Sequence, residues 1–371
     1  MGESLRIGLV GVGTISGAYL DTLTALDGVE LVAAADLVPA RARGVQDRVP
    51  AVRALEVDEL LAAPDVQLVL NLTVPMAHAP VALRAIAAGK MVYGEKPLAA
   101  TTADAAEVLA AAERAGVTLG CAPDTVLGTG IQTARKAIDD GEIGAPISAT
   151  ATMVTPGHEV WHPDPDFYYQ PGGGPLLDMG PYYLSALVTM LGPVVRVSGA
   201  ASRMRGERVI GSGPRRGEVI PAQVDTHVTG LLEHHGGELS TILMSFDAVG
   251  SRASRIEVHG ERGSLVVPDP NHFDGDVALR RLGGTDWEQL PVSAGYLGAG
   301  RGCGIADLAA AGPGRPPRAS AALAYHVLEV MERLLESART GNRLPVRSSA
   351  ARPAPVPLQE LPKRIGALGG C

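Results

Sequence analysis

Short apolar segments alternate with helix-forming segments along the first third of the chain. Residues 101–116 are a typical helix-forming segment, with Gly116 as the stop signal. The segments between the helices are apolar almost throughout, which is typical of strands covered on both faces of a parallel sheet. The predicted strands are 5–13, 30–36, 66–73, 89–97 and 117–123.

The pattern changes near residue 124. Residues 124–141 are predicted as one helix, capped by Asp124 and ending near Gly141. The segments that follow are rich in β-forming residues separated by turn residues, which indicates an antiparallel or mixed sheet. A long helix is predicted over 319–341. The sequence therefore predicts an α/β protein with a nucleotide-binding-type domain, 1–123, followed by an α+β domain, 124–371.

The composition is that of an ordinary soluble protein, with 46% hydrophobic and 19% charged residues among 371. The net charge is −8 and no basic stripe occurs, so we expect neither nucleic acid nor an anionic membrane as a partner. Three cysteines without C-x-x-C spacing indicate a reducing compartment and no zinc site. The chain shows neither a signal-peptide pattern nor a long apolar run, so we expect a cytoplasmic protein.

The segment 11–16, Gly-Val-Gly-Thr-Ile-Ser, lies between the first predicted strand and a helix. This is the dinucleotide-binding fingerprint with Ser16 at the third small position. The first glycine permits the tight turn, and the second lets the backbone approach a pyrophosphate at the helix N-terminus. The candidate cofactor-binding residues of this turn are Gly11, Gly13, Thr14 and Ile15.

Asp36 ends the next predicted strand, where a carboxylate would bind the ribose hydroxyls of the cofactor. A carboxylate there favours NAD, because it would repel the 2′-phosphate of NADP. Arg41 and Arg43 follow closely, which keeps NADP as an alternative.

Glu95-Lys96-Pro97 comes at the end of a predicted parallel strand, where open α/β sheets bind ligands. Lys96 would project toward the nicotinamide, whose positive charge would lower the pKa of the amine and make it a proton acceptor. A surface Glu–Lys pair before a proline explains the same residues equally well. The residues alone do not separate the two interpretations.

The segment 172–183 reads GGGPLLDMGPYY. Three glycines are costly in backbone entropy, so we expect the chain to pass close to substrate or cofactor before a helix begins. Asp178 lies in or beside the first turn of that helix, and Tyr182 shares its face four residues later. Tyr183 points elsewhere, and packing is the expected role of this tyrosine.

The segment 157–170 combines two histidines with several acidic residues, a mixture that could ligate a metal. Pro163 and Pro165 break any helix there, so the ligands would not converge on one rigid face. We therefore expect no metal site and favour a loop that lines a sugar site. In that interpretation Trp161 stacks on the sugar ring and His162 binds a hydroxyl group.

The fingerprint, Thr73 and His78 before an Ala-rich helix, the Glu95-Lys96-Pro97 block and the glycine run before Asp178-x-Gly180 together resemble one family. This is the Gfo/Idh/MocA family of oxidoreductases, which includes inositol dehydrogenase, glucose–fructose oxidoreductase and dimeric dihydrodiol dehydrogenase. The resemblance extends from residue 5 to about residue 345.

The resemblance implies a Rossmann domain, a C-terminal domain with an open and mainly antiparallel sheet, and a homodimer or homotetramer formed through that sheet. It also implies NAD(H) or NADP(H) as cofactor and a sugar, cyclitol or related polyol as substrate. Three departures from the family pattern occur: Tyr182 stands where many members have His, the usual Thr-Pro is Thr73-Val74-Pro75, and Asp124 follows the last strand of the first domain where members often have Arg or Asn near the cofactor. The implied catalytic residues are Lys96, Asp178 and Tyr182; the implied cofactor-binding residues are Thr73, Pro75, His78, Glu95 and Lys96; and the substrate candidates are Trp161, His162 and Asp124.

The favoured function is hydride transfer between nicotinamide and a secondary alcohol or ketone. Lys96 and Tyr182 are expected to handle the proton, with Asp178 holding Lys96 or a substrate hydroxyl, and either of the pair could be the base. A redox-neutral enzyme that uses NAD to cleave a glycoside is an alternative on the same fold. A non-catalytic nucleotide sensor is a third, which the three intact residues argue against.

Overall fold

The structure is a computed structural model that describes residues 4–311 and 315–362. Contacts divide the described chain into two compact units. The first holds residues up to Gly128, Ala294–Tyr325 and the segment from Val356 on, and the second holds Thr129–Ser293 and His326–Pro355.

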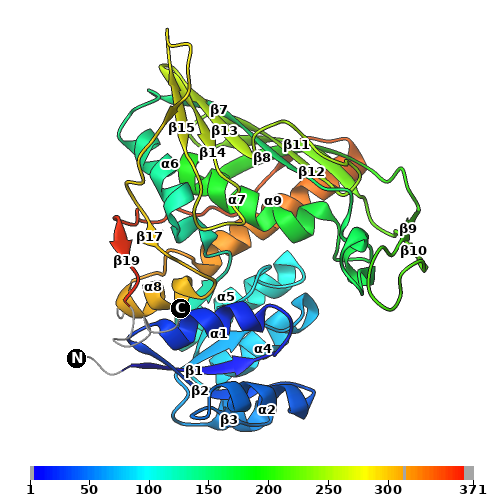
Figure 1. The fold of residues 1–371 in the computed structure, drawn as a ribbon, viewed down its shortest axis with the longest axis vertical. Coiled ribbons are helices and arrows are strands. Elements are labelled where there is room, and N and C mark those ends of the chain that lie inside the picture. The colour runs from blue at the N-terminus through cyan, green and yellow to red at the C-terminus, as the bar shows by residue number, and fades with distance from the viewer. Residues whose placement is uncertain (1–3, 312–314, 363–371) are drawn as a thin grey trace. The chain divides into compact units, whose positions relative to one another are not determined.

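The first unit is built on a six-stranded parallel sheet with the order β3-β2-β1-β4-β5-β6 (Figure 1). The order reverses between β1 and β4, and open α/β sheets bind ligands beyond the carboxyl ends of the strands at such a point. All five predicted strands are confirmed, and the sequence missed the two-residue β3. The strands are β1 Leu5–Val10, β2 Val29–Ala35, β3 Arg53–Ala54, β4 Leu68–Asn71, β5 Met91–Gly94 and β6 Leu119–Cys121.

Helices connect these strands, as in a Rossmann fold. The predicted helix 101–116 is confirmed as α5, which Thr101 caps by accepting a hydrogen bond from the Asp104 backbone N–H. Gly116 ends α5 in the left-handed conformation at φ +65°, a region that favours glycine. The helices are α1 Ser16–Ala25, α2 Pro39–Arg48, α3 Val57–Ala62, α4 Pro75–Ala87 and α5 Thr102–Ala115.

Asp124 does not cap the helix predicted over 124–141, and that prediction was wrong. The segment is broken by extended backbone at Gly128 into a short 3-10 helix, Thr125–Leu127, and α6, Thr129–Asp139. The carboxylate of Asp124 is fully buried and accepts the N–H groups of Gly302 and Gly304, at 2.8 and 3.1 Å, where α8 (Cys303–Ala311) begins. Burial raises the pKa of Asp124, although these two donors act in the opposite direction. The Asp124 side chain therefore stabilises the start of α8, which lies far along the chain.

The domain boundary also differs from the single cut predicted between 123 and 124. Residues 124–128 and 294–325 cluster with the Rossmann sheet. The physical reason is a set of contacts within that unit: Asp124 holds the start of α8, and the Cys121 N–H donates to the Ala319 carbonyl at 3.1 Å. Two further short strands, β17 Tyr296–Leu297 and β19 Gln359–Glu360, pair with each other in parallel.

The second unit contains a nine-stranded sheet in which seven of the eight neighbouring pairs are antiparallel. The exception is the parallel pair β7–β12. This confirms the mainly antiparallel sheet. In spatial order the strands are β16 Glu288–Gln289, β15 Ala278–Arg281, β14 Gly263–Val267, β13 Ile256–Gly260, β7 Pro146–Val154, β12 Leu239–Ser245, β11 His227–His234, β8 Val194–Ser202 and β18 Leu344–Pro345.

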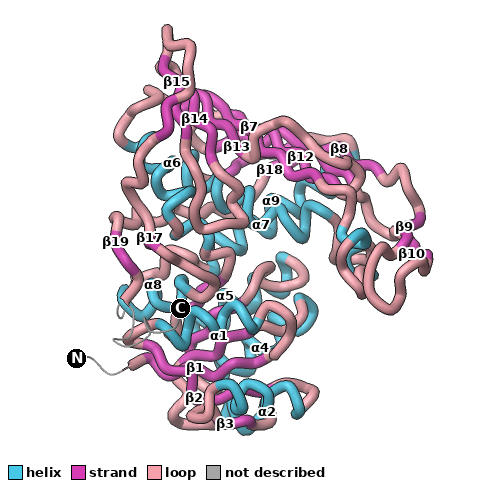
Figure 2. Tube along the Cα trace, viewed as in Figure 1, coloured by secondary structure: helices cyan, strands magenta, loops and turns pink. Residues whose placement is uncertain are grey.

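Helices α6, α7 (Pro175–Leu191) and α9 (Ala321–Thr340) lie along one face of this sheet (Figure 2). Gly199 and Gly230, which pair across β8 and β11, let α9 approach: a Cβ at Gly199 would lie 2.4 Å from the Leu334 carbonyl oxygen. The predicted helix 319–341 is thereby confirmed.

Alternation along the strands leaves part of the other face of the sheet exposed. In β7, Ala149, Ala151 and Met153 are buried whereas Thr150, which points to the opposite face, is exposed. Leu231 of β11 and Leu239 of β12 lie on the same face as Thr150 and are exposed as well. Exposed apolar side chains on a sheet face are consistent with a subunit interface. The homo-oligomer expected through this sheet stays a prediction.

A small hairpin-like pair, β9 Glu207–Val209 and β10 Val219–Pro221, lies beside the loop that joins β7 to α7. That loop contains two 3-10 helices, η2 His158–Val160 and η3 Asp166–Tyr168. Within the described residues, no helix combines the length and the apolar character needed to cross a bilayer.

Candidate functional site

The turn between β1 and α1 has the shape that a dinucleotide needs. Gly11 has φ +93°, and a Cβ there would lie 2.8 Å from backbone atoms of Leu72 and Thr73, so only glycine fits. Gly13 is exposed, and a Cβ there would meet no atom within 4 Å, which leaves its backbone open to a ligand. Ser16 is buried and its hydroxyl donates to the Gly13 carbonyl at 2.7 Å. This geometry fits a pyrophosphate at the N-terminus of α1.

Asp36 follows β2, and two backbone N–H groups fix its carboxylate. The Val12 N–H donates to Oδ2 at 2.7 Å and the Val38 N–H donates to Oδ1 at 2.8 Å. The Arg41 guanidinium lies 3.7 Å from Oδ1. Because each carboxylate oxygen has two acceptor positions, both oxygens keep one for a ribose hydroxyl.

Asn71 and His78 join the loops that follow β4 and β5. Asn71, the last residue of β4, accepts the Thr73 hydroxyl at 2.6 Å and donates to the His78 carbonyl at 3.0 Å. The buried His78 ring lies between two carbonyls, with Nδ1 2.6 Å from that of Pro97 and Nε2 2.9 Å from that of Thr73. Both ring nitrogens of His78 therefore contact the protein backbone, and they hold both loops at the cofactor edge of the sheet.

Lys96 lies directly after β5, half-buried, and Glu95 fixes its backbone. The Glu95 carboxylate is buried; Oε1 accepts the Tyr19 hydroxyl at 2.7 Å and Oε2 accepts the Lys96 backbone N–H at 3.0 Å. Burial raises the pKa of Tyr19 well above its usual range, so this phenol remains a hydrogen-bond donor. The contacts set the position of Lys96 at the carboxyl end of the parallel strand.

In the second unit, the central pair is Asp178 with His158. His158 Nε2 lies 2.9 Å from Asp178 Oδ2, and both side chains are largely buried. A carboxylate accepts, so this geometry places the proton of the imidazole on Nε2. Asp178 lies in the first turn of α7, and Tyr182 follows one turn later with its side chain almost completely buried. The two positions share a helix face, as predicted.

An aromatic cluster surrounds His158 in the loop before α7. Its ring centroid lies 4.4 Å from that of Tyr168, 4.5 Å from that of Phe246 and 5.3 Å from that of Trp161. Trp161 is itself 58% exposed and in edge contact with His162. The cluster fixes the direction of the His158 ring and leaves the indole of Trp161 accessible.

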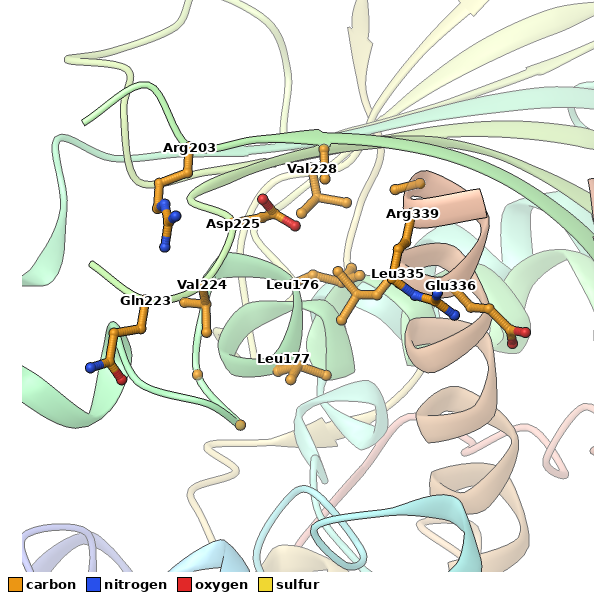
Figure 3. Close-up of a pocket in the computed structure, with 15 residues that line it drawn as sticks. Leu176, Leu177, Arg203, Gln223, Val224, Asp225, Val228, Leu335, Glu336 and Arg339 are labelled. Carbon is orange, nitrogen blue, oxygen red and sulfur yellow. The ribbon is translucent and has the colours of Figure 1, made fainter. Parts of the chain in front are cut away.

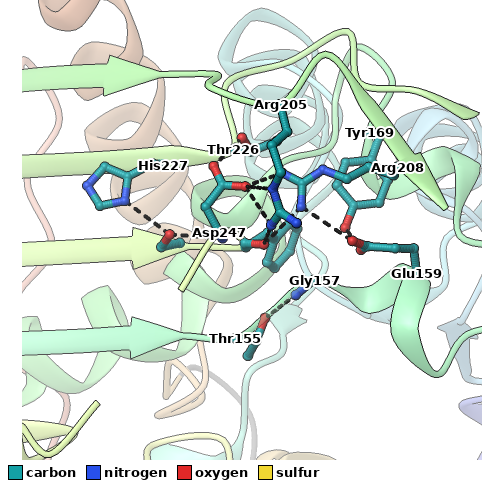
Figure 4. A network of polar contacts seen from close by, with 11 residues as sticks. Thr155, Gly157, Glu159, Tyr169, Arg205, Arg208, Thr226, His227 and Asp247 are labelled. Atoms are coloured by element: carbon teal, nitrogen blue, oxygen red, sulfur yellow. Dashed lines mark hydrogen bonds and ion pairs between the residues drawn. The ribbon is translucent and has the colours of Figure 1, made fainter. Parts of the chain in front are cut away.

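A buried ion network anchors this loop to the sheet (Figure 4). Arg208 of β9 is fully buried and donates to Glu159 Oε1 at 3.3 Å and to the Phe246 carbonyl at 3.1 Å, and it also pairs with Asp247. The Tyr169 hydroxyl donates to the other oxygen of Glu159. Glu159 is the residue next to His158, so the network fixes the backbone from which His158 reaches Asp178.

Asp247 is the second anion of the network. Burial acts to raise the pKa of Asp247, but the Thr226 hydroxyl, 2.6 Å from Oδ2, and the guanidinium groups of Arg208 and Arg205 together hold it below its usual value. Arg205 differs from Arg208 in burial: half of its side chain is exposed, and Arg208 has no exposed area. Arg208 therefore lies between the carboxylates of Glu159 and Asp247.

The glycines of GGGPLLDMGPYY permit close backbone packing. A Cβ at Gly173 would lie 2.5 Å from the Phe167 carbonyl oxygen. Gly174 has φ +94°, and a Cβ there would lie 3.0 Å from the Asp225 carbonyl oxygen. These contacts are with the chain's own backbone.

The structure gathers the predicted residues into two sets, one in each unit. The fingerprint turn, Asp36 and the loops after β4 and β5 lie along the carboxyl ends of parallel strands, with Pro75 as the first residue of α4. Asp178, Tyr182, Trp161 and His162 lie on α7 and the loop before it, whereas Asp124 lies buried at α8. The sequence did not identify Asn71 or Arg208 as contributors to the candidate site. It placed His158 and Glu159 in the loop 157–170 but did not predict their contacts with Asp178 and Arg208.

Two family models match the chain. The oxidoreductase family with an NAD-binding Rossmann fold matches residues 5–122, and the GFO/IDH/MocA C-terminal domain matches residues 131–266. The chain belongs to the Gfo/Idh/MocA family of oxidoreductases. The predicted resemblance and the oxidoreductase class are thereby confirmed.

Relatives of this Gfo/Idh/MocA protein act on sugars and cyclitols. A dTDP-3,4-didehydro-2,6-dideoxy-alpha-D-glucose 3-reductase from Saccharopolyspora spinosa is 29% identical over 84% of this chain and 92% of that protein. A myo-inositol 2-dehydrogenase from Thermotoga maritima is 27% identical over 71% of this chain and 75% of that protein. A levoglucosan dehydrogenase solved with NADH and L-sorbose shares the fold, with a TM-score of 0.78 and 21% identity over 94% of this chain and 100% of that one.

We predict that Arg208→Met destabilises this Gfo/Idh/MocA protein much more than Arg205→Met. Arg208→Met removes the buried cation that pairs with the carboxylates of Glu159 and Asp247. This loss lowers the free energy of unfolding by about 3–5 kcal/mol. Arg205 contacts the same Asp247 from a half-exposed position, and its loss costs less than about 1 kcal/mol. Urea unfolding of both variants with unchanged m-values measures the difference. Equal losses in the two variants would show that the buried guanidinium does not anchor the loop.

Proposed function

We propose that this protein is an NAD(H)-dependent dehydrogenase or reductase of a secondary alcohol or ketone in a sugar, cyclitol or related polyol. The observation that carries the proposal is the Asp178–His158 pair at the start of α7. It occurs in a chain whose N-terminal family model is an NAD-binding Rossmann fold. Relatives named for inositol and for deoxy-sugar substrates support the substrate class.

The chemistry of the paired carboxylate suits a polyol. Asp178 Oδ2 is occupied by His158, which holds the carboxylate in one orientation. A fixed carboxylate accepts hydrogen bonds from substrate hydroxyls, and charge-assisted bonds of this kind are the strong ones. The exposed indole of Trp161 offers an apolar surface for a sugar ring, and His162 lies beside it. We leave Asp124 out of this site because its carboxylate is buried at α8.

In the oxidation, bound NAD would supply the acceptor for the hydride of the carbinol carbon, and a base of the protein would take the hydroxyl proton. The carbon–oxygen single bond becomes a carbonyl, and the reduction reverses each transfer. Lys96 and Tyr182 are the groups that we assign to the proton. A tyrosine with the ordinary pKa of about 10 is a weak base at neutral pH, so a neighbouring cation is needed to make it effective.

NAD is the cofactor that we propose over NADP. Asp36 presents a negative charge at the end of β2, held by the N–H groups of Val12 and Val38. A 2′-phosphate at this position would meet that charge. Arg41 is paired with the same carboxylate at 3.7 Å, which reduces its availability for a phosphate.

We predict that Lys96→Met lowers kcat by at least about 100-fold, because it removes a proton-handling group. Thermal unfolding should show unchanged stability, and NADH titration measures any loss of cofactor affinity separately, so that kcat is compared at saturating cofactor. Lys136→Met is the matched control, since Lys136 lies on α6 in an exposed pair with Asp140 and should leave turnover unchanged. Turnover of Lys96→Met within a few-fold of wild type, with cofactor affinity intact, would refute the assignment.

We predict that Asp36→Asn shifts cofactor preference toward NADP. Asparagine keeps the shape of the side chain but removes the charge that repels a 2′-phosphate, and it frees Arg41 from an ion pair. The ratio of kcat/KM for NAD to that for NADP should fall at least about tenfold, equivalent to about 1.4 kcal/mol. Asp21→Asn, an exposed carboxylate in α1, is the control and should leave the ratio unchanged. A wild-type ratio near one would contradict the proposed preference.

A further inference from the structure

A pocket of about 650 Å³ lies within the second unit, on the helix-covered side of the sheet (Figure 3). Its size is within the range of about 300–1,000 Å³ that is typical of small-molecule sites. The wall is formed by the glycine run before α7, by the first turn of α7, by the ends of β8 and β11 and by the last turns of α9. No residue assigned above to catalysis or cofactor binding lines it.

Helix α7 links the pocket to the candidate substrate site. Leu176 and Leu177 line the pocket, and Asp178 is the next residue of the same helical turn. Gly174 brings this turn against the backbone of Asp225, so the glycine run forms part of the pocket wall. The pocket wall and Asp178 therefore share one helical turn of the second unit.

Polar groups with unused hydrogen-bonding capacity line the pocket. Within the part of the chain that the structure describes, the side chains of Gln223, Asp225 and Arg339 make no hydrogen bond or ion pair. Arg203 donates one N–H to the Ala222 carbonyl at 2.7 Å and retains four further N–H groups. Figure 3 shows Arg203, Asp225 and Arg339 approaching the pocket from three different elements.

The pocket lining contains as many acidic as basic side chains. Arg203 and Arg339 are opposed by Asp225 and Glu336, so the lining carries no net charge. A phosphate or diphosphate would gain from the two arginines but would be repelled by the acids. A sugar hydroxyl both donates and accepts, and it matches a lining that mixes donors with acceptors. The apolar part of the wall suits the C–H face of a ring and consists of Leu176, Leu177, Val224, Val228 and Leu335.

We propose that this pocket is a subsite for a second, uncharged sugar ring, so that the enzyme acts on a glycoside or disaccharide with its reacting ring at Asp178. The inference rests on the proposed function, since it extends the substrate of the same site. It assigns Asp225 and Arg339 as specificity-determining residues that bind the ring beyond the glycosidic bond.

The test compares one-ring and two-ring substrates. NAD⁺ reduction is measured with free sugars, inositols and methyl glycosides, and with maltose, cellobiose, trehalose and lactose. Wild type should show kcat/KM at least about tenfold higher for one or more of the disaccharides than for the corresponding methyl glycoside. Asp225→Ala and Arg339→Met should each remove about tenfold of kcat/KM for that disaccharide, the effect expected for one hydrogen bond to a charged group. Both should leave the one-ring substrates within about twofold.

Arg343→Met is the matched control, because Arg343 is an exposed arginine of the same unit that pairs with Glu233 and does not line the pocket. It should change neither substrate class. Oxidation of one-ring substrates without any gain from a second ring would overturn the subsite and leave the proposed function intact. Equal losses on both classes would also overturn it. Failure to oxidise either class would count against the proposed function itself, and the subsite would fall with it.

Discussion

The buried guanidinium of Arg208 is the interaction on which the loop before α7 in the second unit depends. It lies between Glu159 and Asp247 without any exposed area. Each ion would be costly to bury alone, and the three together are tolerated because their hydrogen bonds are shared with Tyr169, Thr226 and the Phe246 carbonyl. The loop that carries His158 is thus fixed by electrostatics, and its regular secondary structure is limited to the two short 3-10 helices η2 and η3. The orientation of Asp178 follows from that loop.

The first unit is organised differently, by hydrogen bonds from side chains that lie at the carboxyl ends of its parallel strands. Asp36, Asn71 and Glu95 each use a side chain after or at the end of a strand to fix the next turn of backbone. His78 then joins two of these turns. The sheet holds the strand ends in place, and the polar side chains at those ends hold the loops that follow them.

Elements that depend on a local sequence pattern could be predicted, whereas contacts between residues far apart in the chain could not. Strands β1, β2, β4, β5 and β6 were predictable because buried parallel strands are apolar throughout. The role of Asp124 was not, since its partners Gly302 and Gly304 lie far along the chain and a cap was the obvious local explanation. The contacts of His158 and Arg208 were missed for the same reason: a histidine in a proline-rich loop and an arginine in a three-residue strand carry no periodic signal. The candidate residues that a motif encodes, such as Lys96 and Asp178, could be named from sequence and stay a prediction, whereas the contacts that position Asp178 required the fold.

The most direct test of the proposed hydride transfer follows the hydrogen on the carbinol carbon of the substrate. A sugar or cyclitol that the enzyme oxidises is prepared with deuterium on the carbinol carbon and incubated with NAD⁺, and both products are analysed by mass spectrometry. We predict that the label moves to the nicotinamide and that the polyol becomes a ketone, in equal amounts. Cleavage of a glycoside without net NADH, or substrate consumption that leaves the nicotinamide unlabelled, would contradict the account.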